Sequence, residues 1–397
     1  MTAQSIILIC AILLLAYLLD LSSKYTRIPT VIWLLAIGWS LKQFTTYAHI
    51  QVPKLNGILP IFGTIGLILI VLEGALDLKL SKKSIPQIKT AFFLSLLPLV
   101  VFSIVFAWAL VVGQQTTWRI ALINALPFAI ISSAIAIPSV RNLSAKIRAF
   151  ITYESSISDI IGVLVFNFIL VHKVYDTKAF FGFFGQIIIV LLFSVVLTIL
   201  LSFLLSRMSH HVKFGPILLL IILLYGLSKL WHLPGLIFIL LFGLTLSNLH
   251  LFREWKFAIY FQPEKIPHEI KQFADIVAEA TFLIRSLFFV LFGFLIQTSD
   301  LLNIAVLPWS VGIILLIYSS RLLFLKISRL PIKPHIFIAP RGLITILLFL
   351  SIPLKLQLPI VNQALIIQAI LLSILIMMLG LIFFKDPLPN TKPYENN

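Results

Sequence analysis

Long apolar runs separated by short polar loops recur along almost the whole chain of 397 residues, and they constrain its fold more than any other feature. Hydrophobic residues make up 60% of the sequence and charged residues 11%, and the mean hydropathy of +1.10 is far above that of soluble proteins. An α-helix needs roughly 20 apolar residues to cross a bilayer. The sequence therefore predicts an all-α polytopic membrane protein with about 13 spans, at residues 5–20, 28–44, 57–76, 90–113, 119–140, 146–172, 183–206, 213–231, 234–250, 279–298, 305–325, 334–353 and 358–384.

The distribution of positive charge predicts how these spans are oriented. Of the 30 Lys and Arg residues, 20 fall in loops on one side of the predicted spans and seven on the other, and Arg285, Arg321 and Arg341 lie within spans. Because cytoplasmic loops carry the excess of Lys and Arg, we expect the N-terminus outside and the C-terminus in the cytoplasm. These short loops also account for the net charge of +16, so the sequence does not indicate a nucleic-acid partner.

The predicted spans form a single transmembrane domain with a short cytoplasmic tail. Six spans precede a linker span and six follow it, as in transporters built from inverted repeats. The boundaries are 1–385 for the domain, 1–172, 183–206 and 213–385 for the first repeat, the linker and the second repeat, and 386–397 for the tail. The polar stretch 251–278 is expected to be an inner-face connector with an amphipathic helix. The sequence holds no phosphate-binding loop or dinucleotide fingerprint, so we expect a secondary transporter without a cofactor rather than an enzyme.

The sixth span carries the sequence Glu154-Ser-Ser-Ile-Ser-Asp159 in a segment that otherwise favours lipid. A carboxylate near the middle of a bilayer is costly, so Asp159 is a candidate functional residue; a packing carboxyl kept protonated or hydrogen-bonded is the alternative. Ser155 lies four residues before Asp159 and shares its helix face, whereas Glu154 points roughly 140° away. We expect Asp159 and Ser155 to offer oxygen ligands in a watery cavity and Glu154 to turn toward a basic partner.

Two spans are expected to be interrupted, the fifth at Ser132 and Ser133, ahead of a proline, and the twelfth at Pro340-Arg341-Gly342. Proline removes a backbone donor and glycine loosens the helix. Irregular backbone at membrane depth is tolerated only where it lines a cavity or is buried in protein, and interruptions in both halves indicate a transporter binding site. The alternative for the fifth span is an ordinary proline kink that the serine hydroxyls stabilise.

Three further charged residues lie within predicted spans. Glu73, near the inner end of the third span, either reaches the cavity beside Asp159 or extends into the lipid headgroups. Arg321 in the eleventh span needs a buried partner and is a candidate for a structural ion pair. Arg285, one turn inside the tenth span, is expected to bridge locally to Glu279.

Taken together, these residues resemble the motifs of the monovalent cation:proton antiporter superfamily, with the NhaP-like and NHE-like sodium/proton exchangers, over nearly the whole chain. The family's sixth-helix Glu-Ser-x-x-Asn-Asp, its third-helix Glu-Gly-Gly-Leu-like stretch, its twelfth-helix Arg-Gly pair and a tenth-helix segment all have counterparts here. The matching positions are Glu154, Ser155, Ser158 and Asp159; Glu73, Gly74 and Leu76; Arg341 and Gly342; and residues 288–293. The resemblance implies the NhaA/NhaP-like antiporter fold, with two broken helices that cross, and a homodimer.

The resemblance also implies roles for individual side chains. Asp159 would bind the cation and the proton in turn. Ser155 and Glu73 would be further ligands of the transported metal ion. Glu154 would pair with Arg341 as a structural brace.

Two positions depart from the family pattern. Ser158 replaces the Asn of the sixth-helix motif, and Ser132 and Ser133 stand where the interrupted fifth helix usually has Thr-Asp-Pro. The resemblance extends the candidate site to these three serines, and a fifth helix without the Asp is a feature of the Kef-like potassium branch. The predicted function is electroneutral exchange of Na⁺, or of Li⁺ or K⁺, for H⁺ by alternating access, serving pH homeostasis at a bacterial inner membrane. A cation channel and a transport-inactive antiporter-like sensor are the alternatives.

Overall fold

The helices described here come from a computed structural model of the chain. It describes residues 3–26, 29–49, 58–78, 80, 84–141, 143–172, isolated positions between 182 and 200, 214–230, 235–248 and 266–384. Over these ranges the chain consists of helices, turns and short extended segments, with no strand.

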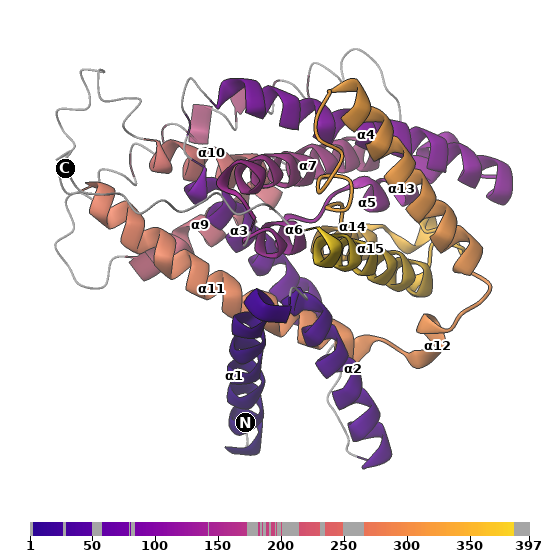
Figure 1. Ribbon diagram of the computed structural model, residues 1–397, viewed down its shortest axis with the longest axis horizontal. Helices are drawn as coiled ribbons and strands as arrows, with labels where there is room; N and C mark the ends of the chain where they lie inside the picture. The colour runs from indigo at the N-terminus through magenta and orange to yellow at the C-terminus, as the bar shows by residue number, and fades with distance from the viewer. Residues whose placement is uncertain are drawn as a thin grey trace.

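One group of helices, called the first bundle here, is centred on the long helix α11. This helix packs most extensively against α2 and α3, and α10 packs against α3 (Figure 1). The members are α1 (Ala3–Thr26), α2 (Thr30–Tyr47), α3 (Ile58–Asp77), α9 (Phe214–Leu230), α10 (Gly235–Ser247) and α11 (Ile266–Leu295). The first bundle therefore combines the first three helices of the chain with three helices from its middle, α9 to α11.

A second bundle is built around α4, which packs against α5, α7 and α13 (Figure 1). The two bundles meet where α3 contacts α6, α7 and α14, a contact that we call the seam. The members of the second bundle are α4 (Ile85–Gln114), α5 (Trp118–Ala129), α6 (Ser133–Ser139), α7 (Ala145–Val171), α13 (Leu307–Ile327), α14 (Leu343–Ser351) and α15 (Gln363–Phe383), with the short helices α12 (Thr298–Leu301) and Leu354–Leu356 in its connections. The candidate site residues of the sixth span lie in this bundle, on α7.

Seven helical segments of the described chain are long and apolar enough to cross a membrane, which agrees with the predicted all-helical membrane fold. The fifth predicted span is broken between α5 and α6, as expected. The twelfth, 334–353, is helical only over Leu343–Ser351, because the residues before it form turns and extended backbone. Most of the predicted linker span 183–206, and all of the tail 386–397, lie outside the described residues.

The predicted start of the tenth span at residue 279 is wrong. Helix α11 begins at Ile266 and runs for 30 residues, so it includes the described part of the polar stretch 251–278. The Glu, Lys and Gln residues of this stretch are good helix formers, and the helix can therefore continue beyond its apolar part. The segment 251–265 lies outside the described residues.

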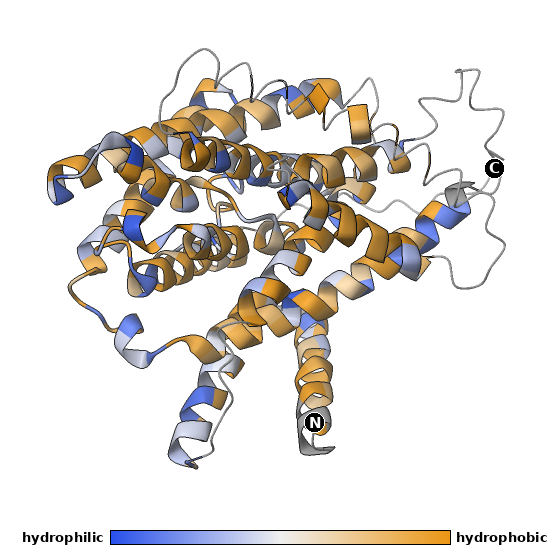
Figure 2. Ribbon diagram, turned by 180° about the vertical axis from the view of Figure 1, so that it is seen from behind, coloured by the Kyte–Doolittle hydropathy of each residue, from blue (hydrophilic) through white to orange (hydrophobic). Residues whose placement is uncertain are grey.

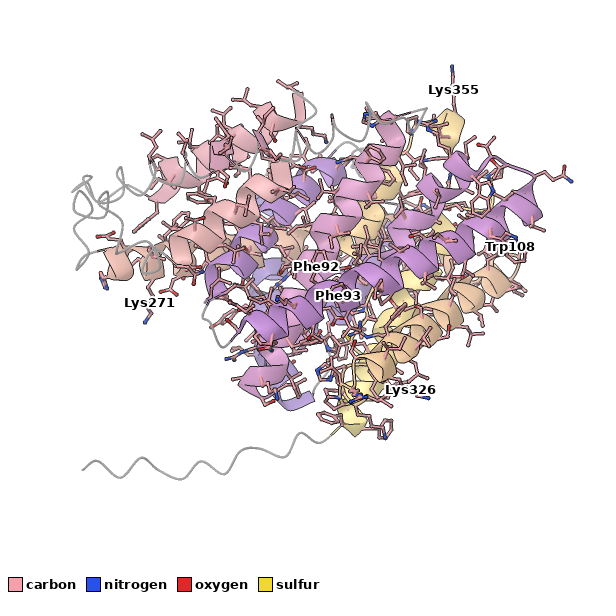
Figure 3. All side chains as sticks on the ribbon, turned by 90° about the horizontal axis from the view of Figure 1, so that it is seen from above. Phe92, Phe93, Trp108, Lys271, Lys326 and Lys355 are labelled. Atoms are coloured by element: carbon pink, nitrogen blue, oxygen red, sulfur yellow. The ribbon has the colours of Figure 1, made fainter. Side chains whose placement is uncertain are left out.

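Most helices consist largely of hydrophobic residues (Figure 2), and many large apolar side chains are exposed on the outside of the molecule. Phe92, Phe93 and Trp108 stand on the outside of α4, with 41%, 52% and 57% of their surface exposed (Figure 3). Contiguous exposure of large apolar side chains is unfavourable in water and favourable in lipid. Together with the apolar spans, this surface identifies an integral membrane protein.

Two glycines allow α2 and α11 to touch backbone to backbone. A Cβ atom on Gly38 would collide with the carbonyl oxygen of Val290 and lie 2.7 Å from the amide nitrogen of Phe294. A Cβ atom on Gly293 would collide with the carbonyl oxygen of Leu35. Because the obstructing atoms belong to the backbone, no side-chain rearrangement can make room.

We therefore expect Gly293→Ala to lower the stability of the folded protein by about 1–3 kcal/mol, as overpacking of a tight contact does. Thermal unfolding in detergent would measure this as a lowered melting temperature. The matched control is Gly312→Ala on α13, where a new Cβ atom meets nothing within 4 Å. Equal melting temperatures for the two variants would contradict the close helix contact.

Candidate functional site

The two interrupted spans cross in the middle of the second bundle. Helix α5 ends at Ala129, and the backbone is extended through Ser132 before α6 begins at Ser133. The Ser132 amide donates a hydrogen bond of 2.9 Å to the carbonyl oxygen of Pro340, in the non-helical segment that precedes α14. The Ser158 hydroxyl oxygen accepts a bond of 3.0 Å from the Ile131 amide. Backbone donors freed by the break are thus satisfied within the protein, as membrane depth requires.

Asp159 lies against this crossing and is completely buried, with 0% of its surface exposed. Its Oδ2 atom accepts a hydrogen bond of 3.3 Å from the Ser133 amide. Its Oδ1 atom has no hydrogen-bond partner among the residues that the structure describes. The carboxylate is therefore held at one oxygen and leaves the other available to a proton or a cation.

Hydroxyl groups accompany this carboxylate. The Ser132 and Thr345 hydroxyls are buried and, within the described part of the chain, make no hydrogen bond. The Ser155 hydroxyl donates to the carbonyl oxygen of Ile151 at 2.8 Å, which leaves its lone pairs unused. Ser132, Ser133 and Ser158 all reach the crossing beside Asp159 through the bonds described above, so the structure brings these predicted residues together.

Glu154 forms a bidentate ion pair with Arg321. The Arg321 Nη1 and Nη2 atoms lie 2.7 and 2.9 Å from the two carboxylate oxygens, and both side chains are buried. A further bond of 2.7 Å joins Arg321 Nε to the carbonyl oxygen of His335. The predicted pairing of Glu154 with Arg341 is therefore wrong, whereas Arg321 occupies the ion pair for which it was a candidate.

Arg341 has different partners because its guanidinium turns toward backbone carbonyls. It donates to the carbonyl oxygen of Phe128 at the end of α5, and to that of Ala339 at 3.0 Å. Its own amide donates to the Ser373 hydroxyl at 2.9 Å. These bonds fix the non-helical segment before α14 to α5 and α15. Arg341 thus provides hydrogen-bond donors to backbone carbonyls that the interruptions leave unpaired.

Glu73 lies at the seam, and the structure records no hydrogen bond between it and Asp159 in the described chain. Its Oε1 atom is 3.7 Å from Nη2 of Arg141, which follows α6. Arg285 of α11 also lies close enough to interact with this carboxylate, whereas the predicted local bridge to Glu279 is not among the ion pairs recorded between described residues. The next residue, Gly74, faces α7: a Cβ atom there would be 3.3 Å from the Ser156 hydroxyl.

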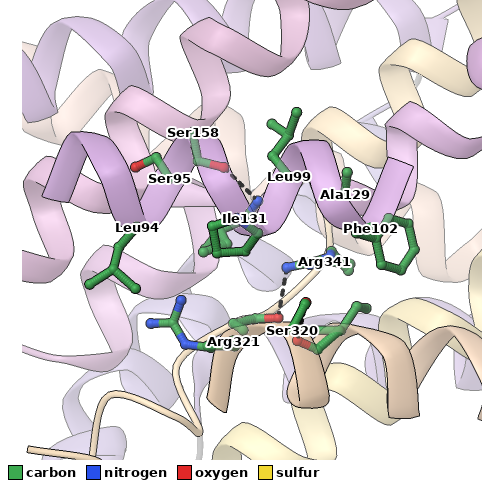
Figure 4. A pocket seen from close by; sticks show the side chains of 13 residues that line it. Leu94, Ser95, Leu99, Phe102, Ala129, Ile131, Ser158, Ser320, Arg321 and Arg341 are labelled. Atoms are coloured by element: carbon green, nitrogen blue, oxygen red, sulfur yellow. Dashed lines mark hydrogen bonds between the residues drawn. The ribbon is translucent and has the colours of Figure 1, made fainter. Parts of the chain in front are cut away.

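A small cavity of about 10 Å³ separates the two buried arginines (Figure 4). Its polar lining comes from Ser95, Ser158, Ser320, Arg321 and Arg341. This volume corresponds to roughly one water molecule. There is therefore room for about one water molecule between α4, α7 and α13, and Asp159 is not among the residues that line this space.

Nearly the whole chain, including these residues, matches a known protein family. Residues 10–385 match the family "Sodium/hydrogen exchanger, transmembrane". The chain belongs to the sodium/hydrogen exchanger family. It is a secondary transporter of the cation/proton antiporter class, as the resemblance predicted.

The fold of this exchanger is that of solved NhaP antiporters. Two structures of the sodium proton antiporter MjNhaP1 from Methanocaldococcus jannaschii match it, one of them at pH 8, with TM-scores of 0.71 and 0.70. They share 20% and 19% sequence identity with the exchanger, and each comparison covers 96% of this chain and 98% or 95% of the other. At these identities the likeness concerns the fold. No curated protein matches the sequence.

Sequence reasoning missed Asn124, a fully buried amide in α5 of the exchanger. Its Nδ2 atom donates a hydrogen bond of 2.7 Å to the carbonyl oxygen of Leu356, and its Oδ1 atom accepts one of 3.2 Å from the Leu358 amide. Asn124 thus fixes the connection that follows α14 to α5. The available signal was a single amide within an apolar span, which is costly unless it is hydrogen-bonded.

The Glu154–Arg321 pair yields a stability prediction. Removing one partner leaves a buried charge unpaired, so we expect Arg321→Gln to destabilise the protein by about 3–5 kcal/mol. Thermal unfolding in detergent would measure this, with the exposed residue Lys326→Gln of the same helix as the control.

A double-mutant cycle would identify the partner of Glu154. The effects of Glu154→Gln and Arg321→Gln should be strongly non-additive, whereas Glu154→Gln and Arg341→Gln should be closer to additive. Stronger coupling of Glu154 to Arg341 would contradict the observed pairing.

Proposed function

We propose that this exchanger carries Na⁺ in one direction and H⁺ in the other, with Asp159 as the carboxylate that binds each in turn. The observation that supports this most directly is the state of Asp159: it is fully buried, and its Oδ1 atom has no partner in the described chain. Glu154 lies on the same helix but is already neutralised by Arg321. Asp159 is therefore the carboxylate of α7 that is free to change its occupant.

Obligatory exchange follows from the cost of an empty, charged site. An ionised carboxylate in a low-dielectric region loses several kcal/mol of solvation unless a cation compensates it. Asp159 can avoid this cost by taking up a proton or by binding a monovalent cation. Reorientation of the empty anion is thus disfavoured, and the two ions replace one another rather than leak.

The oxygen atoms around Asp159 are the proposed ligands of the cation. Carboxylate and hydroxyl oxygens are hard donors that suit Na⁺, and Ser155, Ser132, Ser133 and Ser158 supply hydroxyls around Asp159. Li⁺ or K⁺ are alternative cargoes, because serines stand where relatives have an additional Asp. Glu73 would join this set when movement at the seam brings α3 toward α7.

The proposed transport cycle is a movement of the second bundle against the first. Contacts between the bundles are concentrated at α3 with α6, α7 and α14, whereas contacts inside each bundle are far more extensive. Alternating access in transporters with broken helices commonly moves the group that holds those helices against a scaffold. We further propose a homodimer in a bacterial inner membrane, with the N-terminus outside and the C-terminus cytoplasmic.

The decisive test replaces Asp159 by Asn, which preserves shape and removes the exchangeable charge. In proteoliposomes with an internal pH dye, we expect wild type to exchange H⁺ for Na⁺, and Asp159→Asn to fall to the level of empty liposomes. Na⁺, Li⁺ and K⁺ would be compared in the same preparation to establish the cargo.

Asp300→Asn in α12 is the matched control, because it makes the same chemical change far from the buried crossing. It should transport like wild type. Undiminished exchange by Asp159→Asn would remove this residue from the mechanism. Flux that never saturates and ignores the proton gradient would support a channel instead.

One titrating carboxylate per cycle also predicts the stoichiometry. One H⁺ leaves as one monovalent cation enters, so the exchange is electroneutral. We expect the initial rate of Na⁺-driven exchange to stay constant when valinomycin and K⁺ gradients clamp the membrane potential at different values. A rate that changes with the potential would indicate a second titrating group, for which Glu73 is the first candidate.

A further inference from the structure

Arg141 connects the two bundles at one end of the seam. It follows α6 and so belongs to the second bundle, and its Nη1 and Nη2 atoms lie 3.7 Å from Asp20 of α1 and 3.7 Å from Glu73 of α3. Both carboxylates belong to the first bundle. We call this group of three side chains the Arg141 bridge.

These are the ion pairs between described residues that cross from one bundle to the other; the Glu154–Arg321 pair lies wholly within the second bundle. The remaining contacts at the seam come from the packing of α3 against α6, α7 and α14. A relative movement of the bundles at this end must therefore break or rearrange the Arg141 bridge.

The members of the bridge differ in their access to solvent. The Arg141 side chain is 47% exposed, whereas Asp20 and Glu73 are 24% and 15% exposed. Arg141 thus lies at the outer edge, with the carboxylates behind it. Asp20 is held in place by a bond of 2.8 Å from the Thr30 hydroxyl.

Other charged groups surround the bridge. Arg285 of α11 interacts with Glu73 from the first bundle, and Asp77 lies near both Arg141 and Arg148. The positive charge of Arg141 therefore faces a group of carboxylates at this end of the seam. A monovalent cation that approaches Glu73 from this side meets a guanidinium already 3.7 Å from one of its oxygens.

We propose that Arg141 is a positioning residue that covers Glu73 at this end of the seam, and that an entering monovalent cation must displace it from Glu73. This inference rests on the proposed antiport and assigns a role to a residue outside the Asp159 site. Arg141 acts as an internal competitor that lowers the apparent affinity for the cation on the side where the bridge lies. The predicted topology places that side in the cytoplasm.

Two conservative variants should change the cation KM in opposite directions. Arg141→Gln removes the competitor, so the KM for Na⁺ should fall by about two- to fivefold, as expected for partly exposed ion pairs. Asp20→Asn keeps an acceptor for Thr30 but removes one of the two recorded ion pairs of Arg141, which strengthens its pairing with Glu73, so the KM should rise. The maximal rate should change less than the KM in both variants.

The assay would use everted membrane vesicles with a pH dye, which present the predicted cytoplasmic side to added NaCl. Lys146→Gln is the matched control: it removes one positive charge from the exposed start of α7, near Arg141 in sequence, and its side chain forms none of the ion pairs recorded between described residues. Its KM should equal that of wild type, which would separate the bridge from a general surface potential.

The outcomes distinguish this inference from the function on which it rests. Loss of Na⁺/H⁺ exchange in wild type would overturn the proposed function. Normal wild-type exchange, with KM values for Arg141→Gln and Asp20→Asn that are unchanged or shifted in the same direction, would overturn the bridge alone. If Arg141→Gln fails to fold, the rise expected for Asp20→Asn still decides the question.

Discussion

The structure depends on hydrogen bonds between two broken helices, which pair the backbone groups that each interruption leaves free at membrane depth. An unpaired amide or carbonyl in hydrocarbon costs several kcal/mol, so neither interruption could persist alone. The Ser132 amide uses the Pro340 carbonyl, and Arg341 donates to the carbonyl at the end of α5. Each break thus provides partners for the other, and the crossing is stable enough to place a carboxylate beside it.

Charge compensation in the second bundle explains why the two acidic residues of α7 differ. Arg321 neutralises Glu154 with paired hydrogen bonds, whereas Arg341 donates to backbone carbonyls and forms no ion pair with a carboxylate of the described residues. Asp159 has no basic partner in the described part of the chain, and Ser133 is the residue that hydrogen-bonds to it there. Four residues of helix between Glu154 and Asp159 therefore separate a structural carboxylate from one that can exchange its occupant.

Much of this arrangement could be predicted from the sequence, because hydropathy, proline and glycine act locally. The all-helical membrane fold, both interruptions and the shared burial of Ser155 and Asp159 follow from local patterns, whereas the start of α11 at Ile266 did not. The partner of Glu154 could not be predicted, because three arginines lie in different spans of the second half and only three-dimensional packing selects Arg321. The contacts of Asn124 and Arg141 likewise join segments distant in sequence, for which helical periodicity carries no information.

The glycine contact between α2 and α11 has a consequence for motion. Where two backbones touch, sliding of one helix along the other is opposed by steric overlap of main-chain atoms. Side chains elsewhere can adjust by rotating about single bonds. Helices α2 and α11 should consequently travel as one rigid unit. Any rocking of the exchanger is then confined to surfaces where side chains mediate the contact. The missing Cβ atoms of Gly38 and Gly293 thus determine which part of the first bundle stays rigid during such a movement.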